Sequence, residues 1–208
     1  MLFRSDPVTA NLVQDMDAPG GTITGVSDAL NTEMIMKMML AVDPDIQTVG
    51  LLYTSSEDNS ILQIEEAKAI LEEMNLDYVE QTVAGSNDVQ QAVQSIVTRC
   101  DAIYIPTDNT FASAMSLVGS VVMESGTPVI CGATGMVEAG GLITLGLNYY
   151  NLGYQTGEMA VQVLEGADPA SMPVQSQNQY DYVVNEEMLS ALGMELPQSL
   201  LEKMGDAA

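Results

Sequence analysis

A short run of polar residues stands where a predicted strand meets a predicted helix, in IYIPTDNTFASAM at residues 103–115. Its segment TDNT brings two hydroxyls, a carboxylate and an amide to the end of an apolar strand. Near the amino end of a helix Asp108 stays ionised, and a carboxylate with no Lys or Arg nearby in sequence suits an ammonium group. Hydroxyls and helix amino termini can in turn hold a carboxylate. The segment therefore predicts a site for a zwitterion such as an amino acid.

The other predicted strand ends are polar as well, and ligands of open α/β sheets bind outside the carboxyl ends of the strands. These segments are TSSEDN (54–59), AGSND (84–88), TDNT (107–110), GATG (132–135) and NYYN (148–151). None contains a basic residue, which argues against nucleotides and sugar phosphates. The candidate ligand contacts that these segments supply are Ser55, Ser56, Asn59, Asp108, Asn109, Thr110, Thr134 and Asn148.

Helix capping competes with ligand contact at each of these places, because Ser, Thr, Asp and Asn are the preferred N-cap residues. Asp108 or Asn109 could cap the helix that begins near Thr110, and Ser56 and Asn87 could cap theirs. The segment TDNT holds more polar groups than one cap requires. There the pattern favours ligand contact.

Apolar strands alternate with segments of helical periodicity from residue 47 onward. Strands are predicted at QTVGLLY, DYVEQTV, DAIYIP, TPVIC and GLITLGL, and helices at 57–75, 87–99, 110–124 and 151–165. Each crossover must return over a face of the sheet, so the pattern predicts an α/β protein with a doubly wound, mostly parallel sheet. The stretch TEMIMKMMLAV (32–42) predicts a core helix with Met34, Ile35, Met38 and Met39 on one stripe. A strand at YDYVV and a helical tail broken near Pro197 end the chain.

Composition excludes several classes of function. Among 208 residues, 29 acidic and 5 basic side chains give a formal charge of −24, which repels nucleic acid and anionic membranes. The absence of His excludes serine or cysteine catalysis that depends on a His base. Cys100 and Cys131 are too few and too distant in sequence for a zinc site, and buried thiols are expected. No apolar run reaches the roughly 20 residues of a membrane span.

Several segments together resemble the substrate-binding proteins of ABC importers, in the group associated with the aromatic amino acids tryptophan and tyrosine. The specific parts are IPTDNT (105–110) and LNYYNLGYQTG (147–157). The similarity continues through SDPVTANLV, PGGTITGVSDAL, TVGLLYTSSEDNS, NDVQQAVQSIV and GEMAVQVLEG in the same order. Asp6, in the first of these segments, completes the set of candidate ligand contacts.

The resemblance implies two lobes of the type I periplasmic-binding-protein kind, which close over a ligand. Residues 26–145 and 181–208 would form the second lobe, and residues 1–25 and 146–180 a remnant of the first. The start MLFRSDPV carries no secretory signal and resembles a truncated one, with Arg4 in place of a small polar residue. An incomplete first lobe predicts uncovered apolar side chains at 151–165, including Met159, Val163 and Leu164, and a homodimer through that surface.

The function that the resemblance implies is non-catalytic capture of a small amino-acid-like ligand, with no cofactor, followed by docking on an ABC permease. Full-length members act outside the cell or in the periplasm, tethered to the membrane. One alternative is the ligand-sensing effector domain of a regulator, although no DNA-binding segment is present and the charge opposes DNA binding. A metal-dependent α/β enzyme is disfavoured, because clustered strand-end aspartates and a strand-end Lys are missing.

Overall fold

The computed structural model describes residues 2–3, 6–177 and 180–206, which fall into two compact units. Unit 1 comprises Met1–Leu30 and Leu147–Tyr180, and unit 2 comprises Asn31–Gly146 and Asp181–Ala208. The chain therefore passes from unit 1 into unit 2 and back, and then returns to unit 2. The assignment of these units to the first and second lobe of a binding protein stays a prediction. Arg4, to which the sequence drew attention, lies outside the described residues.

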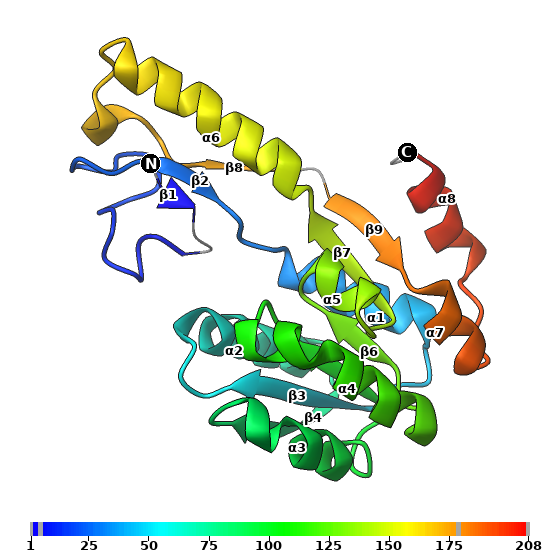
Figure 1. The fold of residues 1–208 in the computed structure, drawn as a ribbon. Helices are drawn as coiled ribbons and strands as arrows, with labels where there is room; N and C mark the ends of the chain where they lie inside the picture. The colour runs from blue at the N-terminus through cyan, green and yellow to red at the C-terminus, as the bar shows by residue number, and fades with distance from the viewer. Residues whose placement is uncertain (1, 4–5, 178–179, 207–208) are drawn as a thin grey trace. The chain divides into compact units, whose positions relative to one another are not determined.

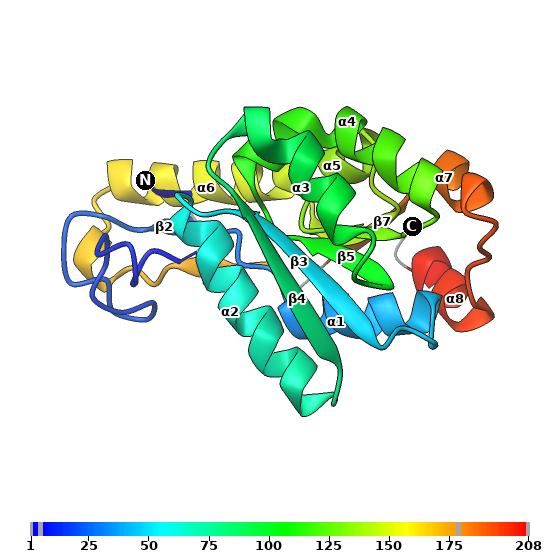
Figure 2. The same cartoon turned by 90° about the horizontal axis from the view of Figure 1, so that it is seen from below.

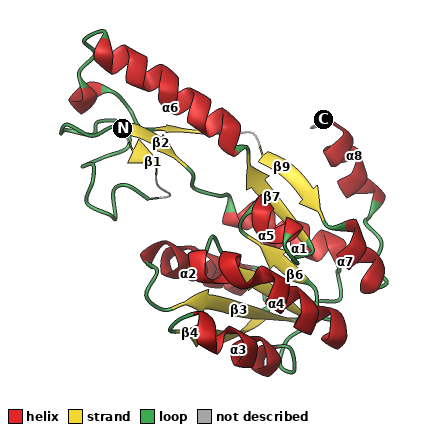
Figure 3. Cartoon of the chain, in the orientation of Figure 1, coloured by secondary structure: helices red, strands yellow, loops and turns green. Residues whose placement is uncertain are grey.

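Unit 2 is built on a six-stranded sheet with the order β4-β3-β5-β6-β7-β9, traced in Figure 1 and coloured as strand in Figure 3. The strands are β3 (Thr48–Thr54), β4 (Asp77–Val83), β5 (Ala102–Ile105), β6 (Val129–Cys131), β7 (Ile143–Leu147) and β9 (Tyr180–Val184). Strand β3 pairs in parallel with β4 and β5, and the pairs β5–β6 and β6–β7 are also parallel. Leu51, Ile103, Val129 and Ile143 thus lie on neighbouring parallel strands. The predicted doubly wound α/β class is confirmed.

Helices cover both faces of this sheet, as Figure 2 shows. On one face lie α1 (Thr32–Val42) and α2 (Asp58–Glu73), and on the other lie α3 (Val89–Ile96), α4 (Asn109–Ser125) and the short α5 (Thr134–Glu138). The 3₁₀ turn η1 (Ser86–Asp88) precedes α3, and the tail adds α7 (Glu186–Ala191) and α8 (Gln198–Asp206). Because both faces are covered, β5 is buried along its whole length, as parallel strands usually are.

The methionine-rich helix α1 packs into the core of unit 2. Ile35, Met36, Met38 and Met39 are buried, whereas Met34 is 38% exposed. The core role predicted for this helix is therefore correct, but the buried stripe includes Met36 in place of Met34. Asn31 caps the helix by accepting a hydrogen bond from the Met34 amide at 3.0 Å.

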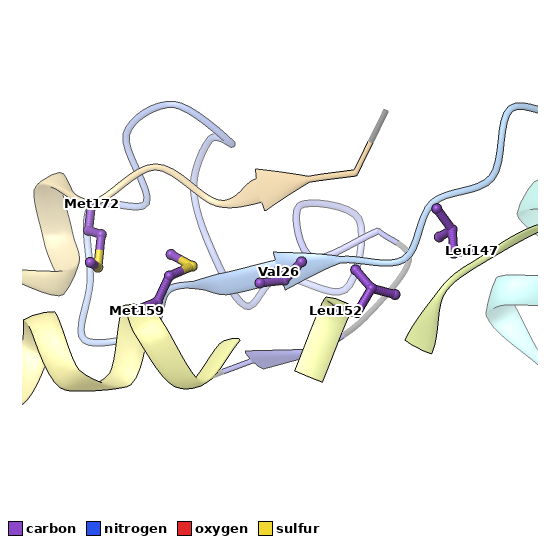
Figure 4. Packing of buried hydrophobic residues seen from close by; sticks show 5 residues of the cluster. All are labelled: Val26, Leu147, Leu152, Met159 and Met172. Carbon is purple, nitrogen blue, oxygen red and sulfur yellow. The ribbon is translucent and has the colours of Figure 1, made fainter. Parts of the chain in front are cut away.

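Unit 1 combines a small parallel sheet with one long helix. Its strands β1 (Leu2–Phe3), β2 (Gly25–Ser27) and β8 (Gln175–Ser176) are parallel in the order β1-β2-β8. The helix is α6 (Tyr149–Leu164), and the 3₁₀ turn η2 (Pro169–Ser171) follows it. Figure 4 shows a buried cluster that joins β2, α6 and the residue after η2, made of Val26, Leu147, Leu152, Met159 and Met172. The cluster gives unit 1 an apolar core of its own.

The outer face of α6 carries large exposed apolar side chains. The exposed fractions are 80% for Tyr150, 62% for Tyr154, 52% for Val161 and 87% for Leu164. Met159, which we predicted to be uncovered, is 1% exposed, because it faces β2 within the cluster. The predicted exposure is thus correct for Leu164, wrong for Met159 and only partial for Val163, which is half-buried against the cluster. The predicted homodimer through this face stays a prediction.

Candidate ligand-binding site

The polar loops of unit 2 gather at one edge of its sheet. They follow β3, β5 and β6, which are parallel, so their carboxyl ends point the same way. Two hydrogen bonds join the loops: Asn59 Nδ2 donates to the carbonyl of Thr107 at 2.7 Å, and Thr107 Oγ1 donates to the carbonyl of Gly132 at 3.3 Å. The structure therefore brings together the segments that we predicted at 54–59, 107–110 and 132–135.

Gly132 sets how closely two of these loops approach. A Cβ atom at this position would lie 2.5 Å from the amide nitrogen of Thr107 and 2.6 Å from the carbonyl carbon of Pro106. Both are backbone atoms, which cannot rotate away as a flexible side chain can. Only glycine therefore permits the spacing between the loop after β5 and the loop after β6.

Asp108 is buried and forms part of the frame beneath the edge. Its side chain is N-cap of α4, and the residue is 1% exposed. Oδ1 accepts from the Phe111 amide and from Thr54 Oγ1, both at 2.9 Å. Oδ2 accepts from the Thr54 amide at 2.8 Å and from Ser60 Oγ at 2.9 Å. We correct the prediction that Asp108 contacts an ammonium group, because four donors within the protein occupy both of its oxygens.

Glu57 is a second carboxylate at the start of α4, and sequence reasoning missed it. Its Oε2 accepts from the amide of Asn109 at 3.0 Å and from Asn109 Nδ2 at 2.7 Å. Its Oε1 accepts from the amide and the hydroxyl of Thr110, both at 3.1 Å. Burial by itself raises the pKa of Glu57, but these hydrogen bonds outweigh it and leave the pKa below its usual value. The amides of α4 that we expected for a ligand carboxylate thus bind Glu57.

The predicted contacts of unit 2 differ in how their side chains are used. Ser55 Oγ donates to the carbonyl of Val83 at 3.2 Å, and the side chains of Asn59, Asn109 and Thr110 are bonded as described above. Ser56 is exposed, and Thr134 is half-buried as the first residue of α5. Within the described part of the chain, no hydrogen-bond partner is found for the hydroxyl of Ser56 or Thr134.

The two predicted contacts of unit 1 are helix-cap and turn residues. Asn148 is N-cap of α6, and its Oδ1 accepts from the Asn151 amide at 3.1 Å. Asp6 Oδ1 accepts from the amides of Val8 at 3.0 Å and Thr9 at 2.9 Å, which closes a turn. Burial raises the pKa of Asp6, but the hydrogen bonds from Thr9 and Val8 lower it further than burial raises it. Their role in binding stays a prediction.

Basic side chains lie outside the strand-end loops. Lys37 and Lys203 belong to α1 and α8, and Arg99 follows α3. Lys68, on α2, pairs with Glu65 and Glu80, each at 2.7 Å. In residues 2–3, 6–177 and 180–206, no group of three His, Cys, Asp or Glu side chains could hold a metal ion. The same described ranges contain no helix with the length and apolarity that a membrane crossing needs.

The doubly wound unit, with its polar edge at the strand ends, has the type I periplasmic-binding-protein fold. A family model described as ABC transporter substrate binding protein matches residues 1–207, and the chain belongs to this family. It is 35% identical over 195 residues to the Tyrosine-binding protein of Clostridioides difficile strain R20291. That match covers 94% of this chain and 56% of the relative, so the chain spans about half the length of this curated protein.

Two solved structures are similar over most of the chain. One is an ABC domain from Streptococcus pneumoniae in complex with L-Trp, at 40% identity and a TM-score of 0.89, with 95% of this chain and 67% of that chain covered. The other is a ligand-free, open substrate-binding protein with adhesive properties from Clostridium difficile, at 39% identity and a TM-score of 0.80. That match covers 95% of this chain and 68% of the other.

Proposed function

We propose that the protein is a non-catalytic solute-binding component of an ABC importer and that it captures a small amino-acid-like ligand with an aromatic side chain. The observation that carries this proposal is the edge of the unit 2 sheet, where hydroxyls, amides and backbone groups of three loops converge without a basic residue. Such an edge suits a ligand of no net charge and disfavours phosphates, which usually need cationic neutralisation.

The names of the relatives support an aromatic amino acid. One relative is called a tyrosine-binding protein, and one similar structure is a complex with L-Trp. Both similarities extend over more than nine-tenths of this chain. They include the segments after β3, β5 and β6, on which the predicted contacts lie.

Within this site we assign direct and indirect roles to the predicted residues. The hydroxyls of Ser56 and Thr134 contact the ligand carboxylate, since neither has another partner among the described residues. Asp108 and Glu57 act indirectly, because they hold the end of β3 against the start of α4. We further propose that the protein works outside the cell or in the periplasm and delivers its ligand to a membrane permease.

A thermal-shift panel tests the proposed ligand class. A ligand that binds only the native state raises stability by about 2.7 kcal/mol at a concentration 100 times its dissociation constant. The proposal predicts that L-tryptophan or L-tyrosine raises the melting temperature in a saturable manner, whereas their D-enantiomers and ribose do so much less. Two results would contradict the proposal: stabilisation of the folded protein by ribose, or the absence of stabilisation by any L-amino acid of the panel.

A further inference from the structure

Asp28 stands at the carboxyl end of the middle strand of unit 1. It directly follows β2, whose residues Val26 and Ser27 are 0% and 1% exposed. The chain turns there, since the Ala29 amide donates to Ser27 Oγ at 3.2 Å. Because β1, β2 and β8 are parallel, this is the edge at which open α/β sheets bind ligands.

The carboxylate of Asp28 has one buried oxygen without a partner. Oδ1 is shielded from solvent and accepts no hydrogen bond from any described residue. Buried polar atoms are nearly always hydrogen-bonded, and an unsatisfied oxygen of a carboxylate is costly to keep. In contrast, both oxygens of Asp108 accept two hydrogen bonds each. Asp28 therefore has, at a strand end, a buried carboxylate oxygen for which the described residues provide no donor.

The unit that contains Asp28 also supplies Tyr149. Burial first, and then the negative charge of Asp28, raise the pKa of Tyr149. Tyr149 is the first residue of α6 and is 42% exposed. Every basic residue that the structure describes belongs to unit 2. The described part of unit 1 therefore provides no Lys or Arg to neutralise Asp28.

We propose that Asp28 binds the ammonium group of the ligand. This inference rests on the proposed function. An ammonium group supplies up to three donors, one of which would satisfy Oδ1 in a charge-assisted hydrogen bond. Asp28 thereby takes the contact with the ammonium group that the sequence predicted for Asp108. Binding through Asp28 requires a ligand with a free amino group.

The test compares the Asp28→Asn variant with the wild-type chain by isothermal titration calorimetry, using L-tryptophan, L-tyrosine and indole-3-propionate. Indole-3-propionate lacks the amino group of tryptophan but keeps its ring and carboxylate. We expect the variant to lose about 10- to 100-fold in affinity for the amino acid, the range of one charge-assisted hydrogen bond, and to leave indole-3-propionate binding unchanged. Asp17→Asn serves as the matched control, because Asp17 is an exposed aspartate of the same unit.

Ligand-free melts exclude a structural explanation. Because no described donor depends on Oδ1, Asp28→Asn should melt at or above the wild-type temperature. The inference is overturned if Asp28→Asn binds the amino acid as tightly as wild type and Asp17→Asn do, or if it weakens both classes of ligand equally. A folded wild-type chain that binds none of the L-amino acids would instead contradict the proposed function, and the role of Asp28 would fall with it.

Discussion

Thr54 donates two hydrogen bonds to Asp108, one from its amide to Oδ2 at 2.8 Å and one from its hydroxyl to Oδ1 at 2.9 Å. Thr54 is the last residue of β3, and Asp108 is N-cap of α4. The pair therefore joins two elements that are separated by 54 positions in sequence. It holds the loop after β3 against the loop after β5 and so shapes the polar edge of the sheet.

Replacement of Asp108 by Ala should cost far more stability than the loss of an ordinary cap. The change leaves the buried amides of Thr54 and Phe111 without their acceptor, whereas Ser60 Oγ keeps the carbonyl of Thr107, so we expect a loss of about 2–4 kcal/mol in the free energy of unfolding. Chemical denaturation measures this loss. Asn31→Ala is the matched control, since Asn31 caps α1 with one exposed hydrogen bond and should cost about 1 kcal/mol. Equal losses in the two variants would contradict the bracing role of Asp108.

Glu57 should make the stability of the protein depend on pH in the acid range. Its pKa is lowered in the folded state, so its contribution is fully present above the unfolded pKa of about 4.3 and is lost as the pH falls through the folded pKa. Glu57→Gln should therefore destabilise the protein by about 1–2 kcal/mol at neutral pH, where a Gln amide can accept only part of the four hydrogen bonds. The difference between the two proteins should shrink below about pH 4.

Melting temperatures from pH 7 to pH 3 check this prediction. For a chain of this size, 1 kcal/mol corresponds to a shift of about 2–4 °C. A difference between Glu57→Gln and wild type that stays constant down to pH 3 would show that the charge of Glu57 contributes nothing.

Gly132→Ala should disturb the edge itself. The added Cβ would collide with the backbone of Pro106 and Thr107, so the two loops must separate, at a cost of about 1–3 kcal/mol. We expect weaker amino-acid binding as well, because the loops carry the proposed contacts. Gly135→Ala is the control in the same segment, since a Cβ there meets nothing within 4 Å. If both variants melt and bind alike, the close approach at Gly132 does not matter for the site.

The architecture of unit 2 could be predicted because its elements have strong local patterns. The segment DYVEQTV coincides with β4, and the helix predicted at 110–124 lies within α4. Four short elements escaped prediction, namely β1, β2 and β8, which have two or three residues each, and α5, which has five, whereas the three-residue β6 lies within the predicted strand TPVIC. Elements of this length show too few apolar residues for a period to be recognised, and they form because of tertiary contacts.

The site was only partly predictable for a different reason. The positions of the predicted strand ends identified the loops that meet. They could not show which carboxylate of unit 2 has all its hydrogen bonds supplied by the protein itself. Asp108 looked available because Thr54 and Ser60, its donors, are about 50 positions away in sequence. Glu57 was overlooked because its partners at the start of α4 are also about 50 positions away in sequence. Asp28 was overlooked because the strand that it follows, β2, has only three residues. Only the hydrogen-bond partners seen in the folded structure distinguish a residue that caps a helix from one that is available to a ligand.

Isothermal titration of the 208-residue protein with L-tryptophan and L-tyrosine tests the central claim most directly. Circular dichroism of the same sample establishes that the chain is folded. The account predicts saturable binding of at least one of these amino acids at a single site, with no comparable heat from ribose or from the D-enantiomers. A folded protein that shows no saturable binding of either amino acid at millimolar concentration would contradict the proposal that it is an amino-acid-binding component of an importer.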